Sequence, residues 1–355
     1  VEAGKYMKDL GASFDDAADA IRIGTGATGD ALDGLLDDFD AVYKSVPTTM
    51  EDASKAIADY NTRLGLTGPQ LQEISKQAIQ VSDMLGDDLG SVIEESSQAF
   101  QQWNIDADDM GGAMDYIFKV SQSTGMGFTD LMADMQKFGP QLQEMGYSFE
   151  TASALMGQLD KAGVNTDEVL GAMKKSVATL AKEGISASDG LAMYYEKIKN
   201  AGTAAEAASI ASEIFGTRAG STMAAAIRDG SLAVADLTAE LQENGETIAG
   251  AADDTYDFAE RLQVMKQGLE VALKPMANTV FDGLNKFMPT LQKLMEQITP
   301  AITKAVEAAA PFVDEFLTGA ADALEDVLPL ISQLVADLLP VLTQLMSTLL
   351  PPLLN

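Results

Sequence analysis

The feature that most constrains the fold is a joint that recurs along the first two thirds of the chain. Each joint has a glycine or asparagine, then one apolar residue, and then a residue that can cap a helix. The joints are Gly65-Leu66-Thr67, Asn104-Ile105-Asp106, Gly127-Phe128-Thr129, Gly146-Tyr147-Ser148, Gly163-Val164-Asn165 and Gly184-Ile185-Ser186. Glycine and asparagine adopt the left-handed conformation that ends a helix, and the capping residue starts the next one. The pattern therefore predicts a string of short helices.

Two of these joints carry a further helix-start signal. Thr67 is followed by Gln70, and Asn165 by Glu168, which is the spacing of a capping box. Between the joints, apolar residues recur at steps of three and four, and no run alternates with the period of a strand. We predict an all-α protein in three parts: helices with a flexible hinge at 1–50, a helical core at 51–250, and an extended amphipathic region at 251–355.

The last part has an eleven-residue proline spacing. Its repeat prolines form two trios with this spacing, Pro289, Pro300, Pro311 and then Pro329, Pro340, Pro351. Apolar residues from Leu291 to Leu353 keep the same hendecad rhythm, which favours a nearly straight helical rod. Proline removes a helical hydrogen bond, so two shapes agree with the pattern: one helix kinked at each proline, or a chain of short helices that each begin at one. The chain lacks an initiator Met and stops inside this repeat, so we expect it to be a piece of a longer one.

Composition excludes several classes of chemistry. The 355 residues include no cysteine and no histidine, which removes disulfides, Cys/His zinc sites and His-dependent catalytic triads. With 23 Lys and Arg against 54 Asp and Glu, the net charge of −31 disfavours direct contact with nucleic acid. We expect no enzymatic activity, no cofactor and no metal.

Local motifs with a chemical interpretation are each better explained by ordinary structure. The stretch from Asn104 to Asp115 places oxygen ligands as in a calcium loop but lacks the glycine at position six and the glutamate at position twelve. Thr217–Ser221 lacks the Lys-Ser/Thr ending of a phosphate loop. The carboxylate pairs Asp87-Asp88 and Asp253-Asp254 are expected by chance in so acidic a chain and indicate a solvated face.

An ordered series of segments resembles the core of tail tape measure proteins of long-tailed bacteriophages and prophages. The series includes "RLGLTGPQLQEISKQA", "AFQQWNI" and "SEIFGTRAGSTMAAAI", and covers residues 45 to 250. Its most specific part contains Phe215, Gly216, Arg218 and Gly220. The proline-spaced region is similar to the segment after the core in many members of this family.

The resemblance implies a structural ruler in the lumen of the virion tail, made in the host cytoplasm, that sets tail length during assembly and leaves with the DNA at infection. It implies as partners the tail tube protein, tail assembly chaperones and baseplate or distal tail proteins, and a trimer or hexamer of the chain, with host membrane contact during ejection. The alternative from the residues is a membrane-inserting helical protein, a pore former or effector. It would use its apolar C-terminal region, where the run from Leu338 to Leu354 has no charge but contains three prolines.

Overall fold

The computed structural model describes residues 2–319, and within this range the chain is helical and contains no strand, as predicted. The helices are α1 (Glu2–Thr25), α2 (Asp30–Tyr43), α3 (Met50–Leu64), α4 (Gly68–Leu85), α5 (Leu89–Trp103), α6 (Met110–Thr124), α7 (Phe128–Glu144), α8 (Phe149–Lys161), α9 (Thr166–Lys182), α10 (Ala187–Lys199), α11 (Ala204–Phe215), α12 (Gly220–Asp229), α13 (Val234–Glu243), α14 (Ile248–Thr255) and α15 (Phe258–Gly319). A single 3-10 turn at Ala107–Asp109 precedes α6.

Five of the six predicted joints connect two helices through a left-handed residue. Asn104 takes this conformation with φ 51°, and Gly146 and Gly163 do so with φ 84° and 65°. The apolar residue then closes the turn, as where the Tyr147 N–H donates to the Leu142 carbonyl oxygen at 3.1 Å. The joint at Gly127 is different, because Gly127 has φ −58° and precedes α7, while Gly125 with φ 85° ends α6.

Of the two predicted capping boxes, one forms only half of its bonds and the other forms none. Asn165 caps α9 by accepting from the Glu168 N–H at 2.9 Å. The Glu168 carboxylate, however, turns away and pairs with Arg218. Thr67 makes no side-chain cap bond at all, and the Gln70 amide donates instead to Asp108 at 2.7 Å. Packing between helices has therefore outcompeted the local back-bond that a capping box would make.

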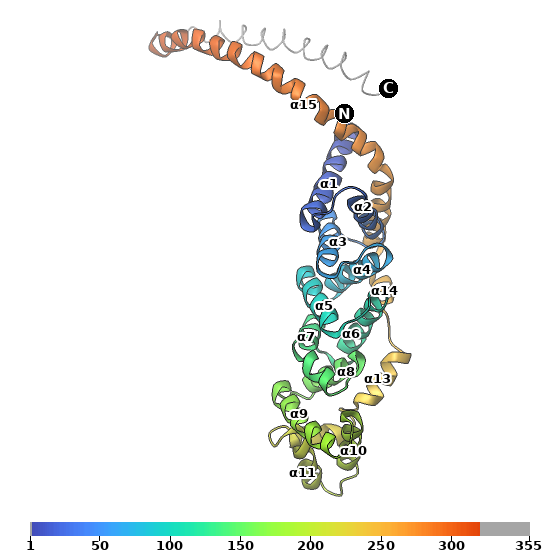
Figure 1. Ribbon diagram of the computed structural model, residues 1–355. Helices are drawn as coiled ribbons and strands as arrows, with labels where there is room; N and C mark the ends of the chain where they lie inside the picture. The colour runs from blue at the N-terminus through green and yellow to red at the C-terminus, as the bar shows by residue number, and fades with distance from the viewer. Residues whose placement is uncertain (1, 320–355) are drawn as a thin grey trace. The chain divides into compact units, whose positions relative to one another are not determined.

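The helices from α2 to α11 follow a spacing that the sequence analysis did not detect. The helices α3, α5, α7, α9 and α11 begin at residues 50, 89, 128, 166 and 204, so their starts are 38 or 39 residues apart. Figure 1 shows α3, α5, α7 and α9 following one another along one row, and α4, α6, α8 and α10 along a second. Helices two places apart pack together, as α3 does on α5 and α4 on α6. This is the arrangement of a helical repeat protein, in which each helix pair contacts the neighbouring pairs. We call α2 to α11 the array.

The core lies between the two rows. Both rows contribute large, fully buried side chains, which include Tyr60, Phe100, Phe118, Phe128, Ile57, Leu71, Ile74, Ile93, Met114 and Ile117. The Tyr60 hydroxyl is satisfied by the Ser96 hydroxyl at 2.9 Å, and burial raises the pKa of this tyrosine. Fully burying an aliphatic or aromatic side chain contributes about 1.5–3 kcal/mol, so this core dominates the stability of the array.

After α12 the chain returns along the same array. Helix α13 packs on α8 and α6, and α14 packs on α6 and α4. The first turns of α15 then reach the start of the array, where the Tyr43 hydroxyl donates to the Glu270 carboxylate at 2.7 Å. The side-chain amides of Gln263 and Gln267 each donate to the Thr48 carbonyl oxygen at 3.0 Å. We call α13, α14 and residues 258–272 the return segment.

The chain divides into two compact units, Ser13–Ala272 and a second one made of Val1–Ala12 with Leu273–Asn355. In the second unit, Gly11 of α1 lies against α15, where an added Cβ would stand 2.8 Å from the Ala277 carbonyl oxygen. Glycine thus allows the two helices to approach closely. The predicted division at residues 50 and 250 stays a prediction.

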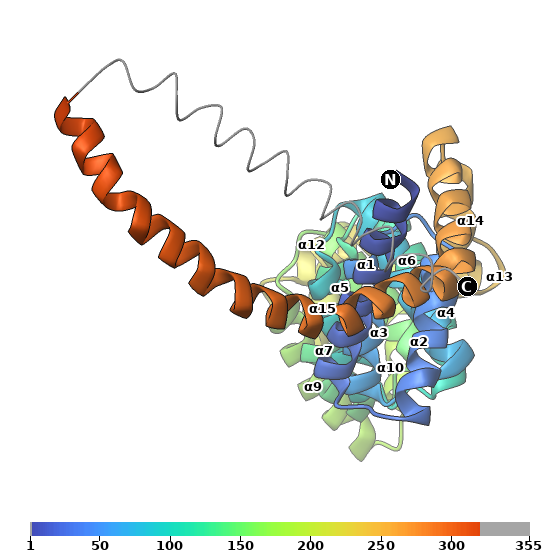
Figure 2. The ribbon, with the colours of Figure 1, turned by 90° about the horizontal axis from the view of Figure 1, so that it is seen from above.

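Helix α15 decides between the two predicted shapes of the proline region as far as the described residues extend. It has 62 residues and runs without interruption through Pro289, Pro300 and Pro311. Figure 2 shows it as one continuous ribbon. These three repeat prolines therefore lie inside a helix and do not begin new ones. Pro329, Pro340 and Pro351 lie outside the described residues, and the hendecad rod stays a prediction.

Candidate functional site

The motif that carries the most specific resemblance forms the corner between α11 and α12. Phe215 ends α11 and is buried, with 3% of its surface exposed. Gly216 follows with φ 86° and ψ 157°, a conformation that is essentially restricted to glycine. The Gly220 N–H then donates to the Gly216 carbonyl oxygen at 2.9 Å, which closes the turn into α12.

Gly220 allows the two helices of this corner to touch. A Cβ at this position would stand 2.1 Å from the Ser212 Oγ and 2.9 Å from the Ser212 Cα. Since the Cα belongs to the backbone of α11, a side-chain rotation alone cannot make room. Gly216 is also close to a neighbour, because its Cβ would lie 3.2 Å from the Cβ of Ala172 in α9.

Arg218 links the same corner to α9. Its guanidinium pairs with the carboxylate of Glu168, although 82% of the Arg218 side chain is exposed. An exposed ion pair contributes about 0–1 kcal/mol, so it adds little to stability. Phe215, Gly216, Arg218 and Gly220 thus come together as a structural corner that joins α9, α11 and α12. The Gly220 amide is used inside the turn and not in a phosphate loop.

The fold places the two ends of the calcium-like stretch in different elements. Asn104 ends α5, whereas Asp115 lies in α6 and faces the return segment. The Asp115 carboxylate accepts from the Gln77 side-chain amide at 3.1 Å and from the Ile248 N–H at 2.9 Å. Burial raises the pKa of Asp115 above its ordinary range, and these two donors partly oppose the shift. Among the described residues, no three acidic side chains are grouped as a metal would require.

A hollow of about 380 Å³ lies where the start of α15 meets the beginning of the array. Asp52, Asp83 and Glu260 line it together with Thr48 and Ser82. Burial, and then the charge of Glu260, raise the pKa of Asp83. The hollow is acidic, and the charges of Asp83 and Glu260 repel each other.

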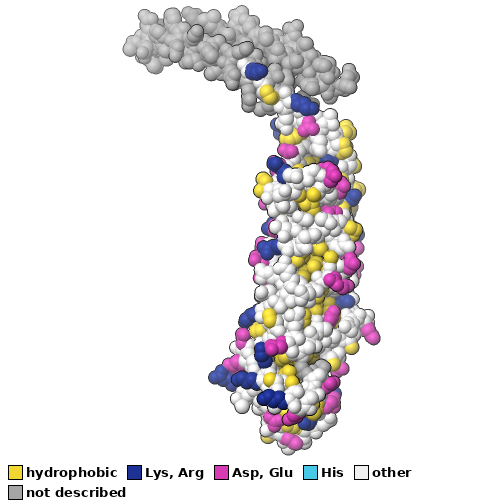
Figure 3. Space-filling model, viewed as in Figure 1, with side chains coloured by type: hydrophobic (Ala, Val, Ile, Leu, Met, Phe, Trp, Pro, Cys, Tyr) yellow, Lys and Arg dark blue, Asp and Glu magenta, His cyan; other side chains and the backbone are white. Residues whose placement is uncertain are grey.

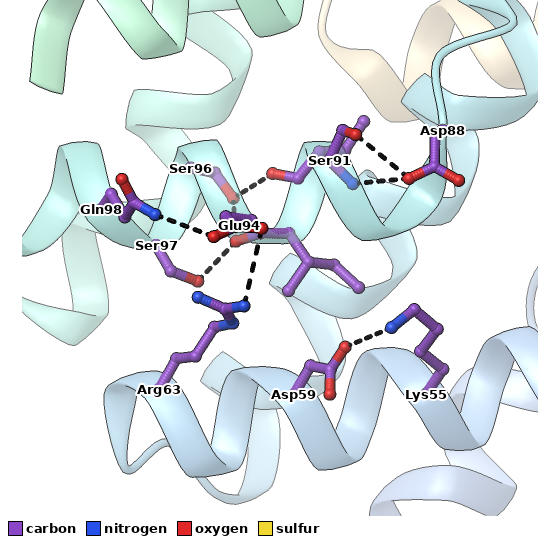
Figure 4. Close-up of polar contacts among 11 residues, drawn as sticks. Lys55, Asp59, Arg63, Asp88, Ser91, Glu94, Ser96, Ser97 and Gln98 are labelled. Carbon is purple, nitrogen blue, oxygen red and sulfur yellow. Dashed lines mark hydrogen bonds and ion pairs between the residues drawn. The ribbon is translucent and has the colours of Figure 1, made fainter.

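The polar side chains between α3 and α5 serve the helices themselves (Figure 4). The Asp88 carboxylate caps α5 through the Ser91 N–H at 2.9 Å, and this bond lowers the pKa of Asp88. The Ser96 and Ser97 hydroxyls donate to carbonyl oxygens one turn back, at 2.6 Å each. The pair Asp87-Asp88 is split, because Asp87 Oδ2 accepts from Thr129 of α7 at 3.4 Å.

The surface has mixed charge on the face that Figure 3 shows, where acidic and basic side chains are scattered between hydrophobic ones. Up to Gly319, no helix combines the length and the apolar character needed to cross a membrane. The uncharged run at Leu338–Leu354 lies outside the described residues.

Sequence reasoning missed two features of the described residues. It missed the spacing of 38 or 39 residues, whose signal was the distance between the helix-ending glycines Gly86, Gly125 and Gly163, which are 39 and 38 residues apart. It also missed the return segment, whose contacts join residues far apart in the sequence, from 122 positions for Lys119 and Leu241 to 227 for Tyr43 and Glu270. No local pattern encodes such a pairing.

Comparison with known proteins gave one family. The family model described as "Phage-related minor tail protein" matches residues 37–216, which cover the array from α2 to the end of α11. The matched region ends at Gly216, within the corner described above. The comparison with curated proteins gave no match, and neither did the comparison with solved structures.

Proposed function

Because this chain belongs to the phage-related minor tail protein family, we propose that it is a tail tape measure protein, a structural ruler inside the tail tube. The observation that carries the proposal is α15, which continues as one helix through three evenly spaced prolines. A ruler needs a segment whose length grows in proportion to its residues. A continuous helix has this property, because each residue adds about 1.5 Å.

The length of α15 agrees with such a role. Its 62 residues correspond to about 93 Å at the helical rise. A globular domain of similar size would not extend so far, since ~100 residues pack within a radius of gyration of ~13 Å. Each eleven-residue unit between prolines would add about 16 Å without changing the pattern of its neighbours.

The helical array would have a different role from the ruler segment. We assign to it the contacts of the chain during assembly, with the tail tube protein, tail assembly chaperones and baseplate or distal tail proteins as partners. The chain would act as a trimer or hexamer in the tail lumen, be made in the host cytoplasm and leave with the DNA. The proposal assigns no catalytic step, no cofactor and no direct nucleic-acid binding to it.

Changing the number of units tests the ruler. Deleting residues 300–310 in the phage should shorten assembled tails by about 16 Å. Duplicating these residues should lengthen the tails by the same amount. Mean tail length is measured by electron microscopy of purified virions. Pro300→Ala is the matched control, because it keeps the residue count and should leave the length unchanged. Tails of unchanged length in both the deletion and the duplication would contradict the proposal.

The alternative of membrane insertion makes an opposite prediction. It depends on the uncharged C-terminal run, so purified chain should cause leakage of dye-filled liposomes. Binding of the chain to tube-protein rings, without leakage, would favour the ruler.

A further inference from the structure

Helix α15 presents an apolar stripe that the protein's own core does not cover. Phe258, Leu262, Met265 and Leu269 are 81%, 46%, 67% and 58% exposed. We call these four residues the α15 stripe. Exposed apolar residues scattered singly are normal, but four in succession on one helix are not.

The stripe has the spacing of a coiled-coil seam. Its steps are four, three and four, so Phe258 and Met265 are seven residues apart, as are Leu262 and Leu269. Met276 continues the second series and is 59% exposed. Alternation of three and four defines the a and d positions of a heptad, at which one helix packs into another. The stripe is therefore shaped for a helix.

The rest of α15 fixes the direction in which the stripe faces. The other side of the helix is anchored to the array through buried Gln267 and Glu270, which are 2% and 7% exposed. They bond to the Thr48 carbonyl and the Tyr43 hydroxyl at 3.0 and 2.7 Å. Rotation of the helix would break these bonds, so the stripe stays at the surface.

The flanks of the stripe are basic, in a chain whose net charge is −31. With Leu262 at an a position, Arg261 falls at g and Lys266 at e, and no other charged residue occupies these positions between Phe258 and Met276. Arg261 bonds to the carbonyl oxygens of Asp253 and Tyr256, which leaves its charge in place. Lys266 forms an ion pair with the Glu270 carboxylate at 3.5 Å, but 67% of its side chain is exposed and open to a second carboxylate. Residues at e and g select the partner of a coiled coil through their charge.

This charge pattern disfavours a second copy of α15 as the partner. In a parallel pair Arg261 would face Lys266 of the other copy. In an antiparallel pair that aligns the stripe on itself, Arg261 would face Gly268 and Lys266 would face Ala259. The parallel arrangement places like charges side by side, which is destabilising, and the antiparallel one gives neither basic residue a carboxylate partner. A lipid surface is also disfavoured, because the seam is narrow and the chain as a whole repels anionic headgroups.

We propose that the α15 stripe is a docking site for an amphipathic helix of another protein, with an apolar heptad seam flanked by carboxylates. The carboxylates would pair with Arg261 and Lys266 while the seam covers Phe258, Leu262, Met265 and Leu269. This site is independent of the ruler function.

A pair of designed peptides tests the charge preference. Each is a fluorescein-labelled three-heptad peptide with Leu at a and d, and it carries either Glu or Lys at e and g. The full chain should bind the Glu peptide about tenfold or more tightly than the Lys peptide in fluorescence anisotropy. The double variant Arg261→Glu/Lys266→Glu should reverse this order, because it inverts the flanks and leaves the seam intact.

Variants of the seam provide the second test. Met265→Glu should abolish binding of the Glu peptide, while Ile23→Glu, which changes an apolar residue of α1 that is 76% exposed, should have no effect. Circular dichroism shows whether each variant keeps its helix content. Equal binding of both peptides, binding of neither, or an unchanged order in the charge-reversed variant would refute the site. Two further results would refute the site if Met265→Glu abolished them. One is self-association of the chain in sedimentation, and the other is binding of the chain to 1:1 phosphatidylglycerol and phosphatidylcholine vesicles.

Discussion

At the scale of single residues, the most informative position is Gly220. The corner between α11 and α12 depends on the absence of a side chain, because a Cβ would meet both the Oγ and the Cα of Ser212. Gly220 stands out in the sequence only through a family resemblance, which does not give this reason. The close approach of α11 and α12 brings Gly220 against Ser212, eight residues earlier and across a turn. A sequence motif does not show the distance between these two residues.

Gly220→Ala should lower the free energy of unfolding by about 1–3 kcal/mol, the usual cost of overpacking. Chemical denaturation followed by circular dichroism measures it. Adding Ser212→Ala should restore part of the loss, because it removes the Oγ but not the backbone. Gly112→Ala is the matched control, since nothing lies within 4 Å of its Cβ. It should be neutral or stabilise by about 0.4–1 kcal/mol. Equal effects at both glycines would contradict the close approach.

Asp115 predicts a pH effect of a defined sign. Its pKa in the folded protein is raised above the ordinary 3.8, so its ionised form is disfavoured by folding. Asp115→Asn keeps an oxygen that can accept from the Ile248 N–H and removes the charge. The variant should therefore melt at a higher temperature than the parent at pH 7. The difference should shrink as the pH falls through the raised pKa toward 3.8, because the parent becomes protonated there.

Asp229 is the control with the opposite sign. The Ser231 hydroxyl and N–H lower its pKa, so its ionised form is favoured by folding. Asp229→Asn should lower the melting temperature at pH 7, and this loss should disappear as the pH falls below the ordinary pKa of an aspartate and through the lowered one. Two aspartates with the same pH response would refute both assignments. Scanning calorimetry between pH 3 and 7 provides the data.

At the scale of helices, local chemistry decides where each element begins and ends. The predicted joints rest on the conformations of one glycine or asparagine and one cap, and these are properties of adjacent residues. Five of the six joints were therefore predictable. The sixth has glycines at both 125 and 127, and only the structure shows that Gly125 takes the left-handed conformation.

The sequence could not supply the side-chain partner where two are available. Glu168 could bond back to its own helix start or reach Arg218, which is 50 residues later, and it takes Arg218. Gln70 likewise bonds to Asp108, in the 3-10 turn before α6, and not to its own helix start. The candidate residues of the α11–α12 corner were found by resemblance, whereas the α15 stripe required knowledge of which face of the helix is buried.

Two cap residues at equivalent joints should differ in energy. Asn165→Ala removes a bond to the Glu168 N–H and should cost about 1 kcal/mol of unfolding free energy. Thr67→Ala removes no cap bond and should lower the unfolding free energy by only a few tenths of about 1 kcal/mol. Both side chains are exposed, so packing does not confuse the comparison. Equal losses in urea denaturation would show that Thr67 does cap α4.

At the scale of the whole chain, excess negative charge should oppose folding. The chain has 54 acidic and 23 basic residues, and the ion pairs of the described residues are mostly exposed. Salt screens repulsion between surface charges, with a Debye length of about 10 Å at 0.1 M. The melting temperature should therefore rise between 10 and 150 mM NaCl. KCl should have the same effect as NaCl. A melting temperature that falls with added salt would mean that attractive ion pairs outweigh the repulsion between acidic side chains.

The return segment has a mechanical consequence for the unit Ser13–Ala272. Because Tyr43 bonds to Glu270, and Thr48 to Gln263 and Gln267, both chain ends of the array are tied at the same place. A pulling force applied between those ends would first load this tie, and α5 to α12 would carry no tension until it broke. The helices of the array would then separate one after another, starting from that end. Its resistance to force would thus be set by a few contacts and not by the size of its core.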